Sequence, residues 1–337
     1  VLTSMEGPFD PCMGTYQLRG LLCRIRKAED QSGADLYSAS LCTDLRPVDR
    51  SSSSVVIDPN RCVLCGNCVH VCRSVQGVGA LEFITTTQGT MAVAAGGKFL
   101  SETGCVGCGQ CVQVCPAQAI HVKSDADAVL EAIQDENTVV MAQIAPSVRV
   151  GLSPQLGLPE GKNAIGQLAA LLRTIGFDRV YDTSVGADLT ILEEGNELLG
   201  RLERGGPLPL ITSCCPAWVQ FCEERFPEFA SHISTCRSPH QMLGAVIRRR
   251  FHTETEYQDK RLFSVSIMPC TAKKTEILRR ESATDGVQDV DCVLTSAELC
   301  ELTDRLGIAP HTLKPQPTDP PYSAETGSGV IFGASGG

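Results

Sequence analysis

The sequence predicts an α/β domain with largely parallel sheets, preceded by a small α+β domain. Residues 55–123 hold two compact cysteine runs and few long periodic segments, which indicates a small domain. From about residue 124, short apolar runs alternate with helical patterns, and such alternation is typical of parallel sheets. We therefore divide the chain into an irregular segment with a serine-rich linker at 1–54, a small domain at 55–123 and a larger domain at 124–337.

The larger domain has four apolar runs that we predict to be strands: 139–144, 208–211, 263–267 and 292–294. Its predicted helices cover 164–175, 188–203, 217–226, 239–250 and 297–306. In parallel α/β sheets, ligands bind beyond the carboxyl ends of the strands. Four unusual loops lie at or near such ends, and we expect them to converge on one site: 145–147, 212–216, 268–270 and the glycine-rich tail after 330–332.

Composition limits the function. The 337 residues suffice for two or three domains, and the net charge of -10 does not suggest a nucleic-acid partner. The chain has no run of 18 apolar residues, so we expect no membrane span and a soluble protein. Because the chain begins at Val1 and ends on GASGG, we expect both ends to be cut.

The two cysteine runs share the spacing C-x2-C-x2-C-x3-C, which is typical of bacterial two-cluster ferredoxins. Three cysteines of each run bind one 4Fe–4S cluster, and the fourth reaches the other cluster. The spacing predicts one cluster on Cys62, Cys65, Cys68 and Cys115, and a second on Cys105, Cys108, Cys111 and Cys72. The alternative is two zinc knuckles. Two clusters in a row would carry single electrons into the larger domain, in a reducing or anaerobic compartment such as a cytoplasm or plastid stroma.

Two neighbouring cysteines, Cys214 and Cys215, stand in the stretch LITSCCPAWV. Adjacent side chains leave the backbone in different directions, so they are poorly placed to serve one metal in the same way. They are either two small buried residues or one ligand beside one reactive thiol.

The stretches LITSCCPAW, VSIMPCTAKKTE and GVIFGASGG resemble the three signature segments of the iron-only (FeFe-type) hydrogenases. The similarity runs from about residue 55 to the end and includes the ferredoxin-like pair of cysteine runs. The resemblance implies an H-cluster, in which a 4Fe–4S cubane is joined to a diiron unit with CO, cyanide and a bridging dithiolate. In this family the H-cluster makes and splits H2.

The resemblance also implies roles for single residues. Cys215 and Cys270 resemble ligands of the cubane, and Cys214 resembles the thiol that exchanges protons with the dithiolate bridge. Lys273 resembles the lysine that donates to an iron-bound cyanide. Without the resemblance, Lys273 and Lys274 would be interpreted as a solvated surface pair.

Further residues match positions that surround the diiron unit. They are Ala145, Pro146 and Ser147, which resemble the loop over the other cyanide, and Ser238, Pro239, Met268, Phe332 and Gly333. Glu276 matches a glutamate near the Cys270 loop, to which we give a supporting role. His240 departs from the family, which usually has Gln there, so it could alter the hydrogen bonding of the pocket.

Glu194, Glu197 and Arg201 have the spacing i, i+3, i+7, which places them on one face of the helix predicted at 188–203. Spacing alone favours an exposed face with a salt bridge. The resemblance instead implies a proton relay from Cys214 through Glu194, Ser234 and Glu197 to Arg201. A carboxylate hands protons on only if no tight ion pair holds its pKa low.

Two features do not fit the family. Its cubane has four cysteines, two of them in a late Cys-x3-Cys segment that this sequence does not contain, so we expect a fragment truncated at its C-terminus. We interpret the spare cysteines as packing residues: Cys222, Cys236, Cys292 and Cys300. Near the N-terminus, Arg26 stands where a 2Fe–2S domain would have a cysteine, so a partial remnant of such a domain would hold Cys12, Cys23 and Cys42.

These observations predict a ferredoxin hydrogenase that reversibly reduces protons to H2. The expected partners are ferredoxin or a similar one-electron carrier, H2 and protons, and maturation proteins that deliver the diiron unit. The first alternative is a non-catalytic, nuclear-prelamin-recognition-like relative in iron–sulfur assembly, which normally lacks the reactive thiol. An H2 sensor and a bare electron-carrier module are further alternatives. The chain has no Gly-rich dinucleotide motif, so NAD(P)H chemistry would require a partner subunit.

Overall fold

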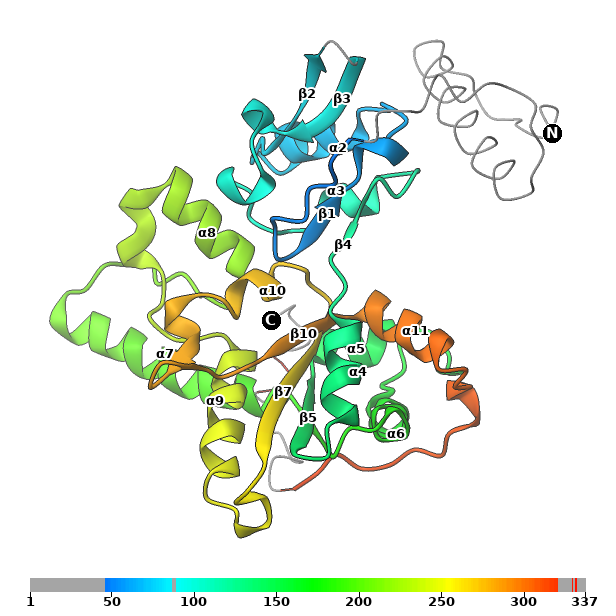
Figure 1. Ribbon diagram of the computed structural model, residues 1–337. Helices are drawn as coiled ribbons and strands as arrows, with labels where there is room; N and C mark the ends of the chain where they lie inside the picture. Colours follow the sequence, from blue (N-terminus) through cyan, green and yellow to red (C-terminus); the bar gives the residue numbers. More distant parts are fainter. Residues whose placement is uncertain (1–45, 87–88, 321–328, 330, 332–337) are drawn as a thin grey trace, which may run out of the picture. The chain divides into compact units, whose positions relative to one another are not determined.

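The computed structural model describes residues 46–86, 89–320, 329 and 331 (Figure 1). The described residues separate into two compact units. One unit holds residues 46–105 and 109–123, and the other holds residues 106–108 and those from 124 onward.

The smaller unit is built from short elements around its cysteines. Strand β1 (Val55–Ile57) pairs with β4 (Ile120–Val122), and β2 (Leu81–Thr86) pairs with β3 (Gly89–Ala94), both antiparallel. Helices α2 (Asn67–His70) and α3 (Gln110–Gln113) each carry the third cysteine of a run. The helices and strands of this unit are short and have little apolar periodicity, so the loops that carry the cysteines make up much of it.

The larger unit contains a four-stranded parallel sheet in the order β10-β7-β5-β6 (Figure 1). Its strands are β5 (Thr138–Ile144), β6 (Arg179–Asp182), β7 (Arg261–Met268) and β10 (Cys292–Thr295). Every residue of β5 is buried, because helices cover both faces of the sheet.

Alternate residues of β5 face two different sets of helices. Val140, Ala142 and Ile144 pack in one apolar cluster with the helices α4 (Ala126–Gln134), α6 (Ile165–Ile175) and α11 (Ser296–Arg305). Val139 and Met141 pack with α9 (Pro239–Phe251) in a second cluster. This alternation follows from the two-residue period of a strand. On the α9 side lies the long helix α7 (Ser184–Arg204), which packs against α9.

The structure confirms three of the four predicted strands and all five predicted helices, within a few residues of their expected ends. Helices α4 and α5 (Pro146–Gly151) and strand β6 were not predicted. The strand prediction at 208–211 is wrong. Pro207 and Pro209 have no N–H to donate to a ladder, and only Ile211 makes a bridge, to Ile233.

Within the described ranges, none of the helices combines the length and the apolar composition that crossing a membrane requires.

Candidate active site and cluster loops

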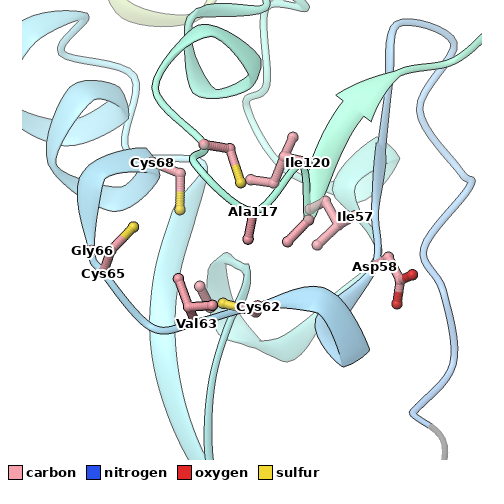
Figure 2. A pocket seen from close by; sticks show the side chains of 12 residues that line it. Ile57, Asp58, Cys62, Val63, Cys65, Gly66, Cys68, Ala117 and Ile120 are labelled. Carbon is pink, nitrogen blue, oxygen red and sulfur yellow. The ribbon is translucent and has the colours of Figure 1, made fainter. Parts of the chain in front are cut away.

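One pocket of the smaller unit is lined by four cysteines from both runs: Cys62, Cys65, Cys68 and Cys115. Figure 2 shows the sulfurs of Cys62, Cys65 and Cys68 facing the same space. The rest of the lining is mainly apolar and includes Ile57, Val63, Ala117 and Ile120. These four cysteines are the set that the sequence predicts for the first cluster.

The electrostatics of this pocket fit a bound cationic group. Burial raises the pKa of the Cys62 thiol, and it raises the pKa of Cys68 to about 12, with the neighbouring thiols adding to the effect. Bound iron lowers thiol pKa values and so offsets this cost. In the part of the chain that the structure describes, no three His, Cys, Asp or Glu side chains are close enough to share one metal ion.

The two cysteine runs share a left-handed backbone conformation at two matching positions. Gly66 and Gly109, which precede α2 and α3, have φ of 80° and 72°. Leu64 and Gly107, two residues earlier, have φ of 58° and 67°. A left-handed conformation is costly for leucine, so its presence at Leu64 indicates that the cysteine loop requires this conformation. The second predicted ligand set, which joins Cys105, Cys108 and Cys111 to Cys72, remains a prediction.

In the larger unit, the Cys214–Cys215 pair precedes α8 (Pro216–Arg225). Cys214 is half-buried and Cys215 is exposed, so the two neighbours lie in different environments. Burial raises the pKa of the Cys214 thiol, while the Lys273 ammonium acts against it. Burial likewise raises the pKa of Cys270, and the nearby Cys215 adds to that shift. Cys215 and Cys270, which were predicted to share a cubane, therefore lie near each other.

Lys273 lies at the Cys214 loop. Its Nζ donates to the Cys214 carbonyl oxygen at 2.8 Å and lies 2.8 Å from Oε2 of Glu276. The same Oε2 lies 2.6 Å from Nε2 of His240. Lys274 is fully buried between Asp125 and Glu298. The interpretation of the two lysines as a solvated surface pair is therefore wrong.

Glu276 and His240 have shifted pKa values. Burial favours a neutral Glu276, but the charges and hydrogen bonds of His240 and Lys273 outweigh it and lower the pKa of Glu276 to about 2. Burial lowers the pKa of His240, although Glu276 opposes that shift. Glu276 therefore stays ionised and accepts from Nε2 of His240.

Glu194, Glu197 and Arg201 lie on one face of α7, as their spacing predicts. Arg201 pairs with Glu197 at 2.6 Å, and the side chains of this pair are only 10% and 15% exposed. An exposed salt-bridged face, the alternative that spacing alone favours, is therefore wrong. Ser234 donates to Oε2 of Glu197 at 2.9 Å, and it also acts to lower the pKa of Glu194.

The two glutamates have opposite pKa shifts. Burial raises the pKa of Glu194, whose Oε1 is buried and has no hydrogen-bond partner in the described part of the chain. Burial also acts to raise the pKa of Glu197, but Arg201 and Ser234 outweigh it and lower that pKa. The negative charge of Glu194 also acts on the Cys214 thiol. Ser234, Glu197 and Arg201 are thus joined by direct contacts, whereas the steps from Cys214 to Glu194 and from Glu194 to Ser234 remain predictions.

Several residues predicted around the diiron unit gather at the ends of β5 and β7. Ala145 N–H donates to the carbonyl of Ile267 at 3.0 Å, so the loops after these strands adjoin. Ala145, Pro146, Pro239 and Met268 are buried, whereas Ser147 is exposed. Phe332 and Gly333 lie outside the described residues, as do Cys12, Cys23 and Cys42.

Ser238 precedes α9, and its Oγ is buried without a hydrogen-bond partner among the described residues. A free hydroxyl beside buried apolar residues fits an anionic ligand at this point. The thiols of Cys215 and Cys270, this hydroxyl and the Lys273 ammonium together form a donor set that fits an H-cluster.

Cys236 is a residue that the sequence analysis misjudged. Cys222 and Cys292 are buried packing residues as predicted, and Cys300 is half-buried. The Sγ of Cys236, by contrast, lies 3.9 Å from Oε2 of Glu197. Its position two residues after Ser234 is the only signal that the sequence offered.

The comparisons with known proteins agree with this geometry. The family "Iron only hydrogenase large subunit, C-terminal domain" matches residues 138–337, and a 4Fe–4S dicluster domain matches residues 58–119. Iron hydrogenase 1 of Clostridium pasteurianum is 38% identical over 290 residues, covering 86% of this chain and 50% of that protein. The NADP-reducing hydrogenase subunit HndD of Solidesulfovibrio fructosivorans is 40% identical over 292 residues, with shares of 85% and 50%.

A relative named for iron–sulfur assembly is more distant. Cytosolic iron-sulfur assembly component 3 of Mus musculus is 31% identical over 221 residues, covering 63% of this chain and 46% of that protein. Among solved structures, one on stepwise H-cluster assembly in an FeFe-hydrogenase is 37% identical with a TM-score of 0.55, covering 61% of this chain and 53% of that chain. The chain spans about half the length of the curated relatives that it matches. With its parallel-sheet α/β domain and its 4Fe–4S dicluster domain, the chain belongs to the iron-only hydrogenase large-subunit family.

Proposed function

We propose that the chain is the catalytic part of an iron-only hydrogenase that interconverts two protons and two electrons with H2. The observation that carries this proposal is the hydrogen-bonded group of Ser234, Glu197 and Arg201, with Glu194 one turn away on α7 and its charge acting on the Cys214 thiol. An electron-carrier module has no use for a buried proton path. An assembly relative that lacks the reactive thiol has no use for such a path either.

The ligands for the metal groups follow from the cysteine positions. Cys62, Cys65, Cys68 and Cys115 would hold one 4Fe–4S cluster, whereas Cys105, Cys108, Cys111 and Cys72 would hold the second. Cys215 and Cys270 would supply two ligands of the H-cluster cubane. When bound, the H-cluster supplies the redox chemistry of H2, and the other clusters supply one-electron transfer.

The protein residues would move and hold protons. The Cys214 thiol stays protonated because burial raises its pKa, so it can give a proton at the inner end of the path. Glu194, whose pKa is also raised, can reload Cys214. Ser234 affects the pKa values of both glutamates and can pass a proton between them. Arg201 holds Glu197 ionised at rest, so this pair must loosen for each proton that enters.

The remaining polar groups would bind and orient. Lys273 and the Ser238 hydroxyl would donate to anionic ligands of the diiron unit, under the buried Ala145, Pro146 and Met268. Electrons would come from ferredoxin or a similar one-electron carrier, and maturation proteins would deliver the diiron unit.

The test is H2 evolution by the chain after anaerobic loading with iron, sulfide and a synthetic diiron cofactor, with reduced viologen as the electron donor. We expect H2 from the parent chain and a loss of about 100-fold or more in Cys214→Ser, the usual range for a removed proton-transfer group. Cys300→Ser, a half-buried thiol on α11, is the matched control and should keep the parent rate.

Two outcomes would contradict the proposal. The first is no H2 from a parent chain that holds about eight iron atoms in its two clusters and has also taken up the diiron unit. That result would favour the electron-carrier module or the assembly relative. The second is full activity in Cys214→Ser, which would exclude this thiol from the proton path.

A further inference from the structure

A buried polar chain lies behind the Cys214 loop, and the proton path does not use it. It begins at the Lys273 ammonium, which contacts the Cys214 carbonyl and Glu276, and it continues to His240. His240 is 2% exposed and Glu276 is 7% exposed, so solvent does not hold these groups in place. A buried ionised carboxylate and ammonium need protein partners to fix their geometry.

His240 is fixed from two further directions. Its Nδ1 lies 3.2 Å from Oγ of Ser266, a residue of β7. Its carbonyl oxygen accepts from Nε2 of Gln143 at 2.9 Å, and Gln143 on β5 in turn accepts from Thr183 at 3.1 Å. Because an ionised carboxylate only accepts, the ring presents its Nε2–H to Glu276, and Nε2 of Gln241 lies 3.1 Å from the same ring nitrogen. The position of Glu276 is therefore tied through His240 to the centre of the sheet.

The two neighbouring lysines differ in how they are held. Lys274 has two carboxylate partners, Asp125 and Glu298, at 2.5 and 2.9 Å. Lys273 has one carboxylate partner, Glu276, besides a neutral carbonyl. If Glu276 turned away, Lys273 would lose its only counter-charge among the contacts that the structure describes. The side-chain position of Lys273 therefore depends on whatever fixes Glu276.

We propose that His240 is a positioning residue that fixes the Glu276 carboxylate and thereby holds the Lys273 ammonium at the Cys214 carbonyl. An ammonium has three N–H donors, and two are used by Glu276 and Cys214. The third is available to an anionic ligand beside the loop. The use of that third donor rests on the proposed function, whereas the fixing of Lys273 by His240 does not.

The test is the rate of amine acylation at single lysines of the full chain, measured by peptide mass spectrometry. The matched variants are His240→Leu, which removes the donor to Glu276, and His240→Gln, which keeps an N–H donor in a side chain of similar size. We expect Lys273 to react about tenfold faster in His240→Leu, the change that the loss of one hydrogen bond to a charged group produces. We expect a rate near the parent value in His240→Gln.

Lys274 is the internal control, because its partners do not involve His240. Its rate should stay at the parent value in both variants. If Lys274 is also acylated faster in His240→Leu, α10 (Lys273–Glu276) has loosened as a whole. The deciding variant is then Ser266→Ala. That variant keeps the ring and removes its Nδ1 partner. It should speed acylation at Lys273 alone, and an unchanged Lys273 rate would overturn the proposal.

Equal Lys273 rates in the parent chain and in a folded His240→Leu would also overturn it. So would a fast Lys273 in His240→Gln, because the effect would then come from ring packing and not from the donor. A separate measurement is the infrared cyanide band of the chain loaded with the diiron unit. We expect the band to shift in His240→Leu and to keep the parent position in His240→Gln. A chain that shows the acylation pattern but binds no diiron unit would contradict the proposed function and leave the positioning role of His240 standing.

Discussion

The Ser234 hydroxyl donates to Oε2 of Glu197 at 2.9 Å and also acts to lower the pKa of Glu194. This serine lies 37 residues after Glu197 in the sequence, yet it affects the pKa values of two glutamates of α7 that are one helical turn apart. One side of the serine has a glutamate of raised pKa, and the other has a glutamate held ionised by Arg201. The predictions below begin with this arrangement.

Both glutamates should be required for H2 evolution. Glutamine cannot take up and release a proton as a carboxyl does, so Glu194→Gln and Glu197→Gln should each lower the rate of the loaded chain by about 100-fold or more. Glu193→Gln, an exposed neighbour on α7, is the control and should keep the parent rate. The measurement is H2 evolution from reduced viologen. Unchanged evolution in Glu197→Gln would exclude this path.

Glu276 should stabilise the fold in a pH-dependent way. Its pKa in the folded chain is about 2, below the ordinary value of 4.5. A lowered carboxyl pKa contributes stability that is fully present above about pH 4.5 and is lost as the pH falls towards 2. The difference in free energy of unfolding between the parent chain and Glu276→Gln should therefore shrink on acidification. This difference is measured by urea unfolding of both chains, from pH 7 down to the lowest pH at which they stay folded.

The exposed Glu301 on α11 provides the comparison for that experiment. Glu301→Gln should leave the pH dependence of the free energy of unfolding close to that of the parent chain. A gap between the parent chain and Glu276→Gln that widens towards low pH would mean that burial, and not His240 and Lys273, dominates the Glu276 pKa.

The grouping of the cluster ligands can be tested by combining substitutions. If Cys62 and Cys115 bind the same cluster, the double variant Cys62→Ala with Cys115→Ala should lose about four iron atoms per chain. Cys72→Ala with Cys115→Ala should lose about eight, because these two residues belong to different clusters. Iron analysis of the chain reconstituted without the diiron unit gives both numbers. A loss of both clusters in the Cys62–Cys115 variant would refute the exchange of the fourth cysteine between runs.

Two glycines of α7 should respond in opposite directions to alanine. A Cβ at Gly186 would overlap the carbonyl oxygen of Pro239, where α7 and α9 pack closely. Gly186→Ala should lower the free energy of unfolding by about 1–3 kcal/mol, as overpacking does. A Cβ at Gly195 meets nothing within 4 Å, so Gly195→Ala should raise it by about 0.5–1 kcal/mol through helix propensity. Urea unfolding of both variants measures these changes in the free energy of unfolding. Equal changes in the two variants would contradict the close packing at Gly186.

The sequence was informative wherever a fixed spacing carries the chemistry. The spacing of the first run and the exchange of one cysteine predicted the pocket of Cys62, Cys65, Cys68 and Cys115. The i, i+3, i+7 spacing predicted a shared helix face for the Glu194, Glu197 and Arg201 side chains. Strands β5 and β7 were predictable because both are rich in apolar residues, as strands buried on both faces are. Strand β6, by contrast, has only four residues and begins and ends with a charge, so it gave little signal.

Sequence by itself thus determined the metal-ligand spacing, most of the helices and the order of strands and loops. Tertiary structure alone decided which polar groups are buried together, because burial depends on contacts between residues far apart in the chain. Spacing alone presented the α7 glutamates as an exposed salt-bridged face, and it is the approach of Ser234 that encloses Glu197. The sequence likewise marked His240 only as a departure from the family. The tertiary structure brings His240 into contact with Glu276, 36 residues away in the sequence. Glu276 in turn pairs with Lys273.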